Sequence, residues 1–132
     1  MIMKLTKMAP ALAWSTLFLA SSAWSQSQAD LNVKAQRSFD AADVMMSQQW
    51  KAAYDAMKQM DAAYQASGND FKFAETALDS QRAWLHLRDQ QCSIESAIFK
   101  GGSMAPMVGI QCQERMTKER TEDLKALLAQ TR

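Results

Sequence analysis

Residues 92–112 read CSIESAIFKGGSMAPMVGIQC, and this stretch decides the fold that the sequence predicts. Cys92 and Cys112 are each ten residues away from Gly102. If helices flank the pair Gly101–Gly102, an antiparallel hairpin brings the two thiols level, because glycines allow the backbone a tight reversal. In an oxidising compartment the two thiols form a disulfide. We therefore predict a disulfide-stapled helical hairpin, in which the cysteines brace the structure and do not act as nucleophiles.

The N-terminal residues have the composition of a secretion signal. Two lysines precede a mostly apolar segment, residues 8–20, and small residues follow it. We expect a signal peptide over residues 1–25, with cleavage after Ala23 or after Ser25. The alternative is an uncleaved anchor, but the apolar segment is shorter than the roughly 20 residues that span a bilayer. We therefore expect a periplasmic or secreted protein.

The rest of the chain, residues 26–132, is long enough for one small domain but not for two hydrophobic cores. Its 107 residues carry 13 Lys and Arg against 14 Asp and Glu, so its formal net charge is −1. This balance gives no general attraction to nucleic acid or to an anionic membrane surface. We expect a single domain that binds no nucleic acid and has no stable membrane insertion after signal cleavage.

Helix-forming residues dominate residues 26–132. Alternating runs of β-branched residues are absent, whereas Ala, Gln, Met, Leu and Lys are abundant. We predict an all-α domain of about three helices, over Asp30–Ala66, over Phe71–Phe99 and from the segment Ser103–Pro106 to about Ala129. The segment Ser67–Asp70 supplies residues that end the first helix and cap the start of the second.

The first predicted helix carries a continuous apolar stripe. Its members recur every three or four residues, as one helix face requires. They are Phe39, Ala42, Met46, Trp50, Ala53, Met57, Met60 and Tyr64. A methionine row can bind copper, but at this spacing methionines more often fill a core, and the chain has a single histidine to assist a metal site. We expect core packing, no metal and no cofactor.

Polar side chains lie within the apolar rows of the predicted hairpin. Gln81 and Arg88 lie at the edge of the row that carries Cys92, and Arg120 lies in the row that carries Cys112. Burying these groups costs free energy unless partners satisfy their hydrogen bonds. We therefore expect each of them to have a partner inside the domain.

The hairpin symmetry pairs positions at equal distances from the glycine turn. It places Trp84 level with Arg120. It also places Arg88 level with Met116, one residue before Thr117. A guanidinium over an indole ring is a cation–π contact of about 1–2 kcal/mol when partly desolvated. We interpret these residues as structural, and the alternative is that the glutamine and the two arginines form a recognition patch.

A set of residues within about 60–128 has a recognisable order and spacing. It comprises QRAWL at 81–85, Arg88, Asp89, Cys92, GGS at 101–103, Cys112, Thr117, Arg120 and Leu124. In this order the residues resemble the lysozyme inhibitor LprI-like N-terminal domain family. The resemblance implies a small, all-helical, disulfide-bonded domain outside the cytoplasm, with inhibition of lysozyme as its activity.

The sequence offers little support for an enzyme. It has no Ser or Cys nucleophile motif, no phosphate-binding glycine loop after a strand and no cluster of metal ligands, and His86 lies between two leucines. A pair of carboxylates brought together by folding could still act on a glycosidic bond. We nevertheless predict a non-enzymatic protein without catalytic residues.

The favoured function is a binding protein that blocks a cell-wall hydrolase such as lysozyme. Lysozymes cleave with two acidic side chains in a cleft, so a protruding basic segment suits that cleft. We predict that the hairpin tip, Lys100, Gly101, Gly102 and Ser103, is this segment, because a braced hairpin loses little entropy on binding. Alternatively, the glycines only close the turn.

A second function hypothesis assigns binding to the first helix. In this alternative, the protein is an envelope accessory or immunity protein that contacts another protein through the apolar stripe. A homodimer formed through the same stripe is a further alternative.

Overall fold

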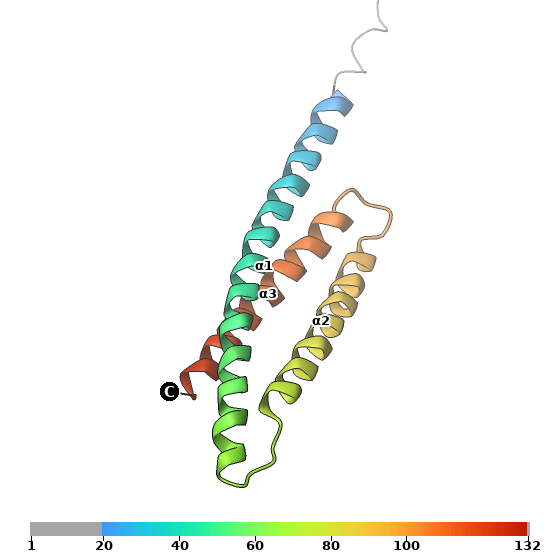
Figure 1. The fold of residues 1–132 in the computed structure, drawn as a ribbon. Helices are drawn as coiled ribbons and strands as arrows, with labels where there is room; N and C mark the ends of the chain where they lie inside the picture. The colour runs from blue at the N-terminus through green and yellow to red at the C-terminus, as the bar shows by residue number, and fades with distance from the viewer. Residues whose placement is uncertain (1–19, 132) are drawn as a thin grey trace, which may run out of the picture.

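The computed structural model describes the backbone of residues 20–131 and the side chains of residues 27–131. The chain forms three helices, α1 (Ala20–Ala66), α2 (Phe73–Ile98) and α3 (Ala105–Ala129), and no strand occurs in this range. α1 and α3 run in the same direction, and α2 runs antiparallel to both (Figure 1). The predicted all-α class is confirmed. None of the helices described here is long and apolar enough to cross a membrane.

α1 begins earlier than its apolar stripe indicates. The pattern predicted a start near Asp30, whereas the helix begins at Ala20. The residues between these positions are Ala, Ser, Gln and Trp, with no glycine or proline to stop a helix. The two expected cleavage points, after Ala23 and after Ser25, fall in this first part of α1. Residues 1–19 of the expected signal peptide lie outside the described residues.

A Schellman motif ends α1 in the segment that the sequence marked as a C-cap. Gly68 has a φ of 81°, a left-handed conformation that favours glycine. The N–H of Asn69 donates to the carbonyl of Tyr64 at 3.0 Å, and the N–H of Gly68 donates to the carbonyl of Gln65 at 3.2 Å. These two bonds satisfy carbonyls that the end of the helix leaves free.

The cap of α2 comes from α1 and not from the turn. The sequence predicted an N-cap within Ser67–Asp70 and a helix that starts near Phe71, but α2 begins at Phe73 and its N-cap position, Lys72, makes no side-chain cap hydrogen bond. Instead, the carboxylate of Asp61 accepts the N–H of Phe73 at 2.6 Å and that of Ala74 at 3.1 Å. The prediction of a local cap was wrong because the first N–H donors of α2 lie within hydrogen-bond distance of a carboxylate on the preceding helix.

α3 begins at Ala105, and Pro106 lies in its first turn as predicted. Ser103 does not cap this helix, because the N-cap position is Met104, which makes no side-chain cap hydrogen bond. The hydroxyl of Ser96 in α2 donates to the carbonyl of Ala105 at 2.9 Å. The start of α3 is therefore held against α2.

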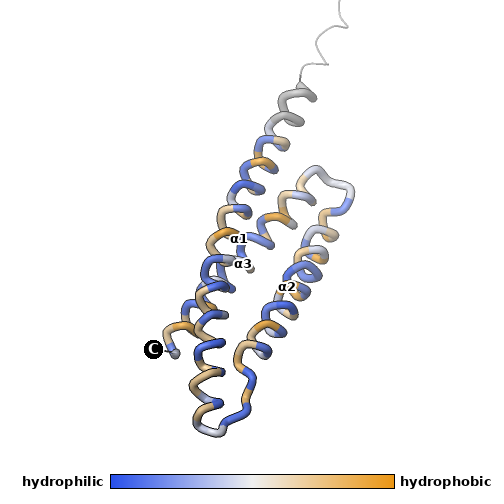
Figure 2. Tube along the Cα trace, viewed as in Figure 1, coloured by the Kyte–Doolittle hydropathy of each residue, from blue (hydrophilic) through white to orange (hydrophobic). Residues whose placement is uncertain are grey.

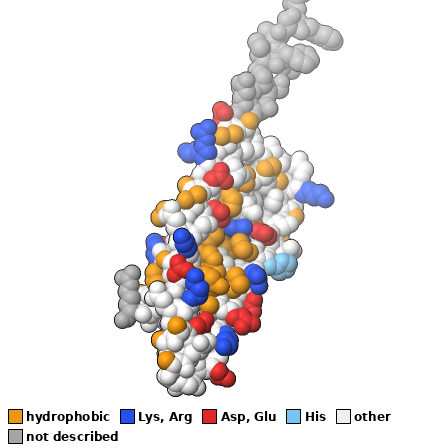
Figure 3. Space-filling view, in the orientation of Figure 1, with side chains coloured by type: hydrophobic (Ala, Val, Ile, Leu, Met, Phe, Trp, Pro, Cys, Tyr) orange, Lys and Arg blue, Asp and Glu red, His pale blue; other side chains and the backbone are white. Residues whose placement is uncertain are grey.

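The core lies along the middle of the predicted stripe of α1, whereas Tyr64 at the end of that stripe is 38% exposed. Met46, Ala53 and Met57 are buried, and Leu124 of α3 packs against the first two of them. Polar and apolar residues alternate along all three helices (Figure 2), which is typical of helices that bury one face. On the side that Figure 3 presents, hydrophobic side chains gather where α1 and α2 lie side by side.

Candidate functional site

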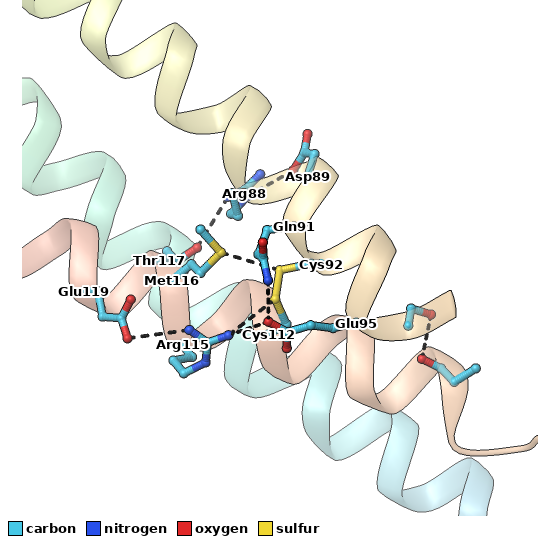
Figure 4. Close-up of a disulfide and its surroundings, with 12 residues drawn as sticks. Arg88, Asp89, Gln91, Cys92, Glu95, Cys112, Arg115, Met116, Thr117 and Glu119 are labelled. Atoms are coloured by element: carbon cyan, nitrogen blue, oxygen red, sulfur yellow. Dashed lines mark hydrogen bonds and ion pairs between the residues drawn. A yellow bond between two sulfur atoms is a disulfide. The ribbon is translucent and has the colours of Figure 1, made fainter. Parts of the chain in front are cut away.

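The predicted disulfide between Cys92 and Cys112 is present and joins α2 to α3 (Figure 4). The two Cα atoms are 5.4 Å apart, and both cysteines are buried. The sulfur of Met116 lies 3.7 Å from that of Cys92. An ion pair between Arg115 and Glu95, at 2.9 Å, joins the same two helices closer to the solvent. A covalent bond and an ion pair thus fix the two legs of the hairpin.

Gly109 lets the two legs approach each other between the disulfide and the tip. A Cβ at this position would lie 3.2 Å from the Cβ of Ser96, which is closer than nine in ten Cβ contacts in proteins. A larger residue here would therefore require Ser96 to shift by a few tenths of an ångström. The role of this glycine is not visible in the sequence, because it depends on which residue faces Gly109 across the hairpin.

The tip of the hairpin is exposed throughout, from Lys100 to Ser103. Gly101 has a φ of 91°, which favours glycine, and the N–H of Gly102 donates to the carbonyl of Phe99 at 3.0 Å. Lys100 has no carboxylate partner among the residues that the structure describes. Its charge is therefore available to a binding partner.

A buried arginine connects all three helices. The side chain of Arg88 is 11% exposed and donates to Asp43 of α1 at 3.4 Å, to the adjacent Asp89 at 3.1 Å and to Thr117 of α3 at 3.4 Å. Its guanidinium carbon also lies 5.6 Å from the centre of the Phe39 ring. The arginine therefore has the partners that its burial requires.

The contact predicted between Trp84 and Arg120 is present. The guanidinium carbon of Arg120 lies 5.8 Å from the centre of the indole ring, and that of Arg88 lies 5.2 Å from it. Arg120 also donates to the carbonyl oxygen of the Gln81 side chain at 3.0 Å, and the amide nitrogen of Gln81 lies 3.3 Å from the sulfur of Met46. These side chains form one connected polar and aromatic cluster.

Burial lowers the pKa of the Arg120 guanidinium, while the carboxylate of Asp123 acts in the opposite direction. The group stays protonated, because the pKa of arginine is far above physiological pH. In the described part of the chain, every buried side-chain nitrogen or oxygen has a hydrogen-bond partner. This satisfaction of the buried atoms supports a structural role for the cluster.

A shallow groove of about 350 Å³ lies between α1 and α3. Its lining includes Lys118 and Lys125, which pair with Glu114 and Glu122. The charges at the groove are therefore already neutralised. No group of three or more His, Cys, Asp or Glu side chains that could hold a metal ion occurs among the described residues.

Two comparisons identify relatives of this chain. The family model described as Lysozyme inhibitor LprI matches residues 20–124. An uncharacterized protein of Rhizobium meliloti (strain 1021) is 34% identical over 109 residues, which cover 77% of this chain and 74% of that protein. No solved structure matches the chain significantly. By the extent of the family match, this chain belongs to the lysozyme inhibitor LprI family.

Proposed function

We propose that this protein inhibits a lysozyme or a related cell-wall hydrolase by binding to it, and that it catalyses no reaction itself. The family match over residues 20–124 carries this proposal. An inhibitor can bind a cell-wall hydrolase only outside the cytoplasm, where the cell wall lies. The proposal therefore includes export, with residues 1–25 as the signal peptide and residues 26–132 as the binding domain.

The hairpin tip is the proposed inhibitory element. Lys100 is exposed and has no carboxylate partner in the described range, so it can approach the acidic pair of a lysozyme cleft. The attraction between opposite charges grows when water is excluded from such a cleft. The disulfide and the close approach at Gly109 hold the tip before binding, which lowers the entropy lost in the complex.

The alternative surface on α1 is not favoured by this fold. The apolar stripe of α1 packs within the chain, where Met46 is 5% exposed, Ala53 1% and Met57 4%. A partner protein or a second copy would have to displace the neighbouring helices to reach these side chains.

The direct test is a titration of the purified protein, expressed from the whole chain, into lysozyme acting on cell walls. We expect the rate of lysis to fall to a plateau as the inhibitor saturates the enzyme. Calorimetry with lysozyme alone separates enzyme binding from coating of the substrate. Full lytic activity of c-type and g-type lysozymes in a molar excess of the protein contradicts the proposal.

A further inference from the structure

One face of α2 exposes large aliphatic side chains. Leu87 is 57% exposed, Ile94 60% and Ile98 74%. Their spacings of seven and four residues place them on the same side of the helix, over a length of about 16 Å at a rise of 1.5 Å per residue. We call these three residues the α2 strip. Ile94 and Ile98 are neighbours on this side of the helix, and the exposed polar residue Gln91 separates them from Leu87. Exposed apolar side chains that share one side of a helix can mark an interaction site.

The charge beside the α2 strip is paired, whereas the charge at its end is not. Glu95 pairs with Arg115 at 2.9 Å. Lys100 follows Ile98 by two residues and has no carboxylate partner among the described side chains. The surface therefore carries apolar side chains along the helix and a positive charge at the tip.

The tip alone is too small to hold a protein partner. It consists of four residues, two of which are glycines without side chains. A stable interface buries about 800 Å² on each partner, and its affinity depends mainly on apolar side chains near its centre. An exposed lysine adds little at physiological salt, because counterions screen it. A tight complex through the tip therefore needs apolar surface that continues from it.

We propose that the α2 strip is the second part of the inhibitory interface, and that its occupant is the apolar wall beside the acidic cleft of the hydrolase. This inference rests on the function proposed above. The order of the groups along α2 matches such a partner: apolar contacts form along the wall, and Lys100 reaches the carboxylates at the centre of the cleft. Burial of Ile94 and Ile98 then provides affinity, and Lys100 provides orientation.

The test compares two double variants with matched chemistry. Ile94→Gln with Ile98→Gln removes the part of the α2 strip nearest the tip. Val44→Gln with Met45→Gln makes the same change at two α1 side chains that are 56% and 54% exposed. Glutamine suits a helix, so both proteins should keep the circular dichroism and melting temperature of the unmodified protein. A single variant, Leu87→Gln, tests the far end of the α2 strip.

The measurement is the dissociation constant for a c-type lysozyme by calorimetry, together with the apparent mass of the inhibitor by light scattering. We expect the Ile94 and Ile98 variant to bind at least about ten-fold more weakly, Leu87→Gln to bind about two- to five-fold more weakly, and the α1 variant to bind as the unmodified protein does.

Three results would overturn the inference, and each has a different meaning. If the unmodified protein inhibits lysozyme and the α2 variants bind equally well, the strip is not part of the interface and the proposed function stands. If the unmodified protein binds no lysozyme, the proposed function fails together with the inference. If the α2 variants only convert a dimer to a monomer, the strip is a contact between copies of this chain.

Discussion

The carboxylate of Asp61, near the end of α1, accepts the backbone N–H of Phe73, in the first turn of α2, at 2.6 Å. Its second oxygen accepts the N–H of Ala74 at 3.1 Å. A negative charge at this point also interacts favourably with the helix dipole. One side chain therefore ties the end of α1 to the start of α2 and fixes how the chain reverses between them.

Replacing Asp61 by alanine should destabilise the protein by about 1 kcal/mol, since two N–H donors of α2 lose their acceptor. Asp70→Ala is the matched control, because Asp70 is exposed in the turn and lies two residues before Lys72, the N-cap position. Denaturant unfolding gives both free energies. An equal loss for the two variants would show that the contact with Phe73 is not the source of the stabilisation.

Replacing both Cys92 and Cys112 by serine should lower the free energy of unfolding by roughly 3 kcal/mol. The bond closes a loop with a sequence separation of 20, and its loss gives the unfolded chain more conformational freedom. Helical content by circular dichroism should stay nearly unchanged, because α1 and the core around Leu124 do not depend on the bond. Two free thiols in protein isolated from its native compartment would contradict the bridge.

A double-mutant cycle tests the contact between Trp84 and Arg120. Trp84→Leu and Arg120→Ala should show a coupling energy of about 1 kcal/mol, since each change removes the same cation–π contact. Arg82 provides the control, because it pairs with Asp79 on the surface, with both side chains well exposed. Arg82→Ala and Trp84→Leu should have additive effects, and additivity in both cycles would count against the contact.

Lys100→Glu tests the tip. The variant should fold as the unmodified protein does, because an exposed turn charge contributes little to stability. It should inhibit lysozyme more weakly, and any binding that remains should be weakest at low salt, where repulsion from the acidic cleft is least screened. Lys72→Glu makes the same change in the exposed turn before α2 and should inhibit normally. Equal inhibition by both variants at all salt concentrations would place the binding surface elsewhere.

The protein should lose stability in acid partly through Glu114. Hydrogen bonds from Lys118 and from the hydroxyl of Ser38 lower the pKa of Glu114 below its ordinary value of 4.5. The ionised form is therefore favoured in the folded state, so its contribution is complete above pH 4.5 and is lost as the pH falls through the lowered pKa. Glu114→Gln should be less stable than the unmodified protein at neutral pH.

The free energies of unfolding of the two proteins should converge as the pH falls through the lowered pKa of Glu114. Ser38→Ala offers a partial version of the same change, because it removes the 2.6 Å bond that links α1 to α3 and leaves the bond from Lys118. A constant difference between Glu114→Gln and the unmodified protein from neutral to acidic pH would mean that another group controls the acid response.

The sequence predicts the helices well where the signal is local. The spacing from Ala42 to Met57 marks the buried face of α1, and Gly68 marks its end. The symmetric cysteines predict the disulfide and the pairing of Trp84 with Arg120, because a hairpin with a known turn has only one alignment. These features need no knowledge of how α1 docks.

Three features that the sequence misses depend on that docking. The cap from Asp61 requires the start of α2 to lie beside the end of α1. The bond from Arg88 to Asp43 requires α1 to lie against the middle of the hairpin. The exposure of Ile94 also becomes known only when one can see which face of α2 the other helices leave uncovered. Side-chain spacing along one helix does not contain this information.

Arg88 has a further consequence for how the domain assembles. Its three polar partners come from three different helices, and its side chain is only 11% exposed. If a neighbouring helix slipped by one turn, about 5.4 Å, the buried charge would lose a partner and gain no water in exchange. We therefore expect Arg88 to discriminate against misaligned bundles more than it stabilises the correct one. The alignment of the hairpin that carries Lys100 at its tip is then supported from inside the protein, by an arginine that makes no contact with the tip.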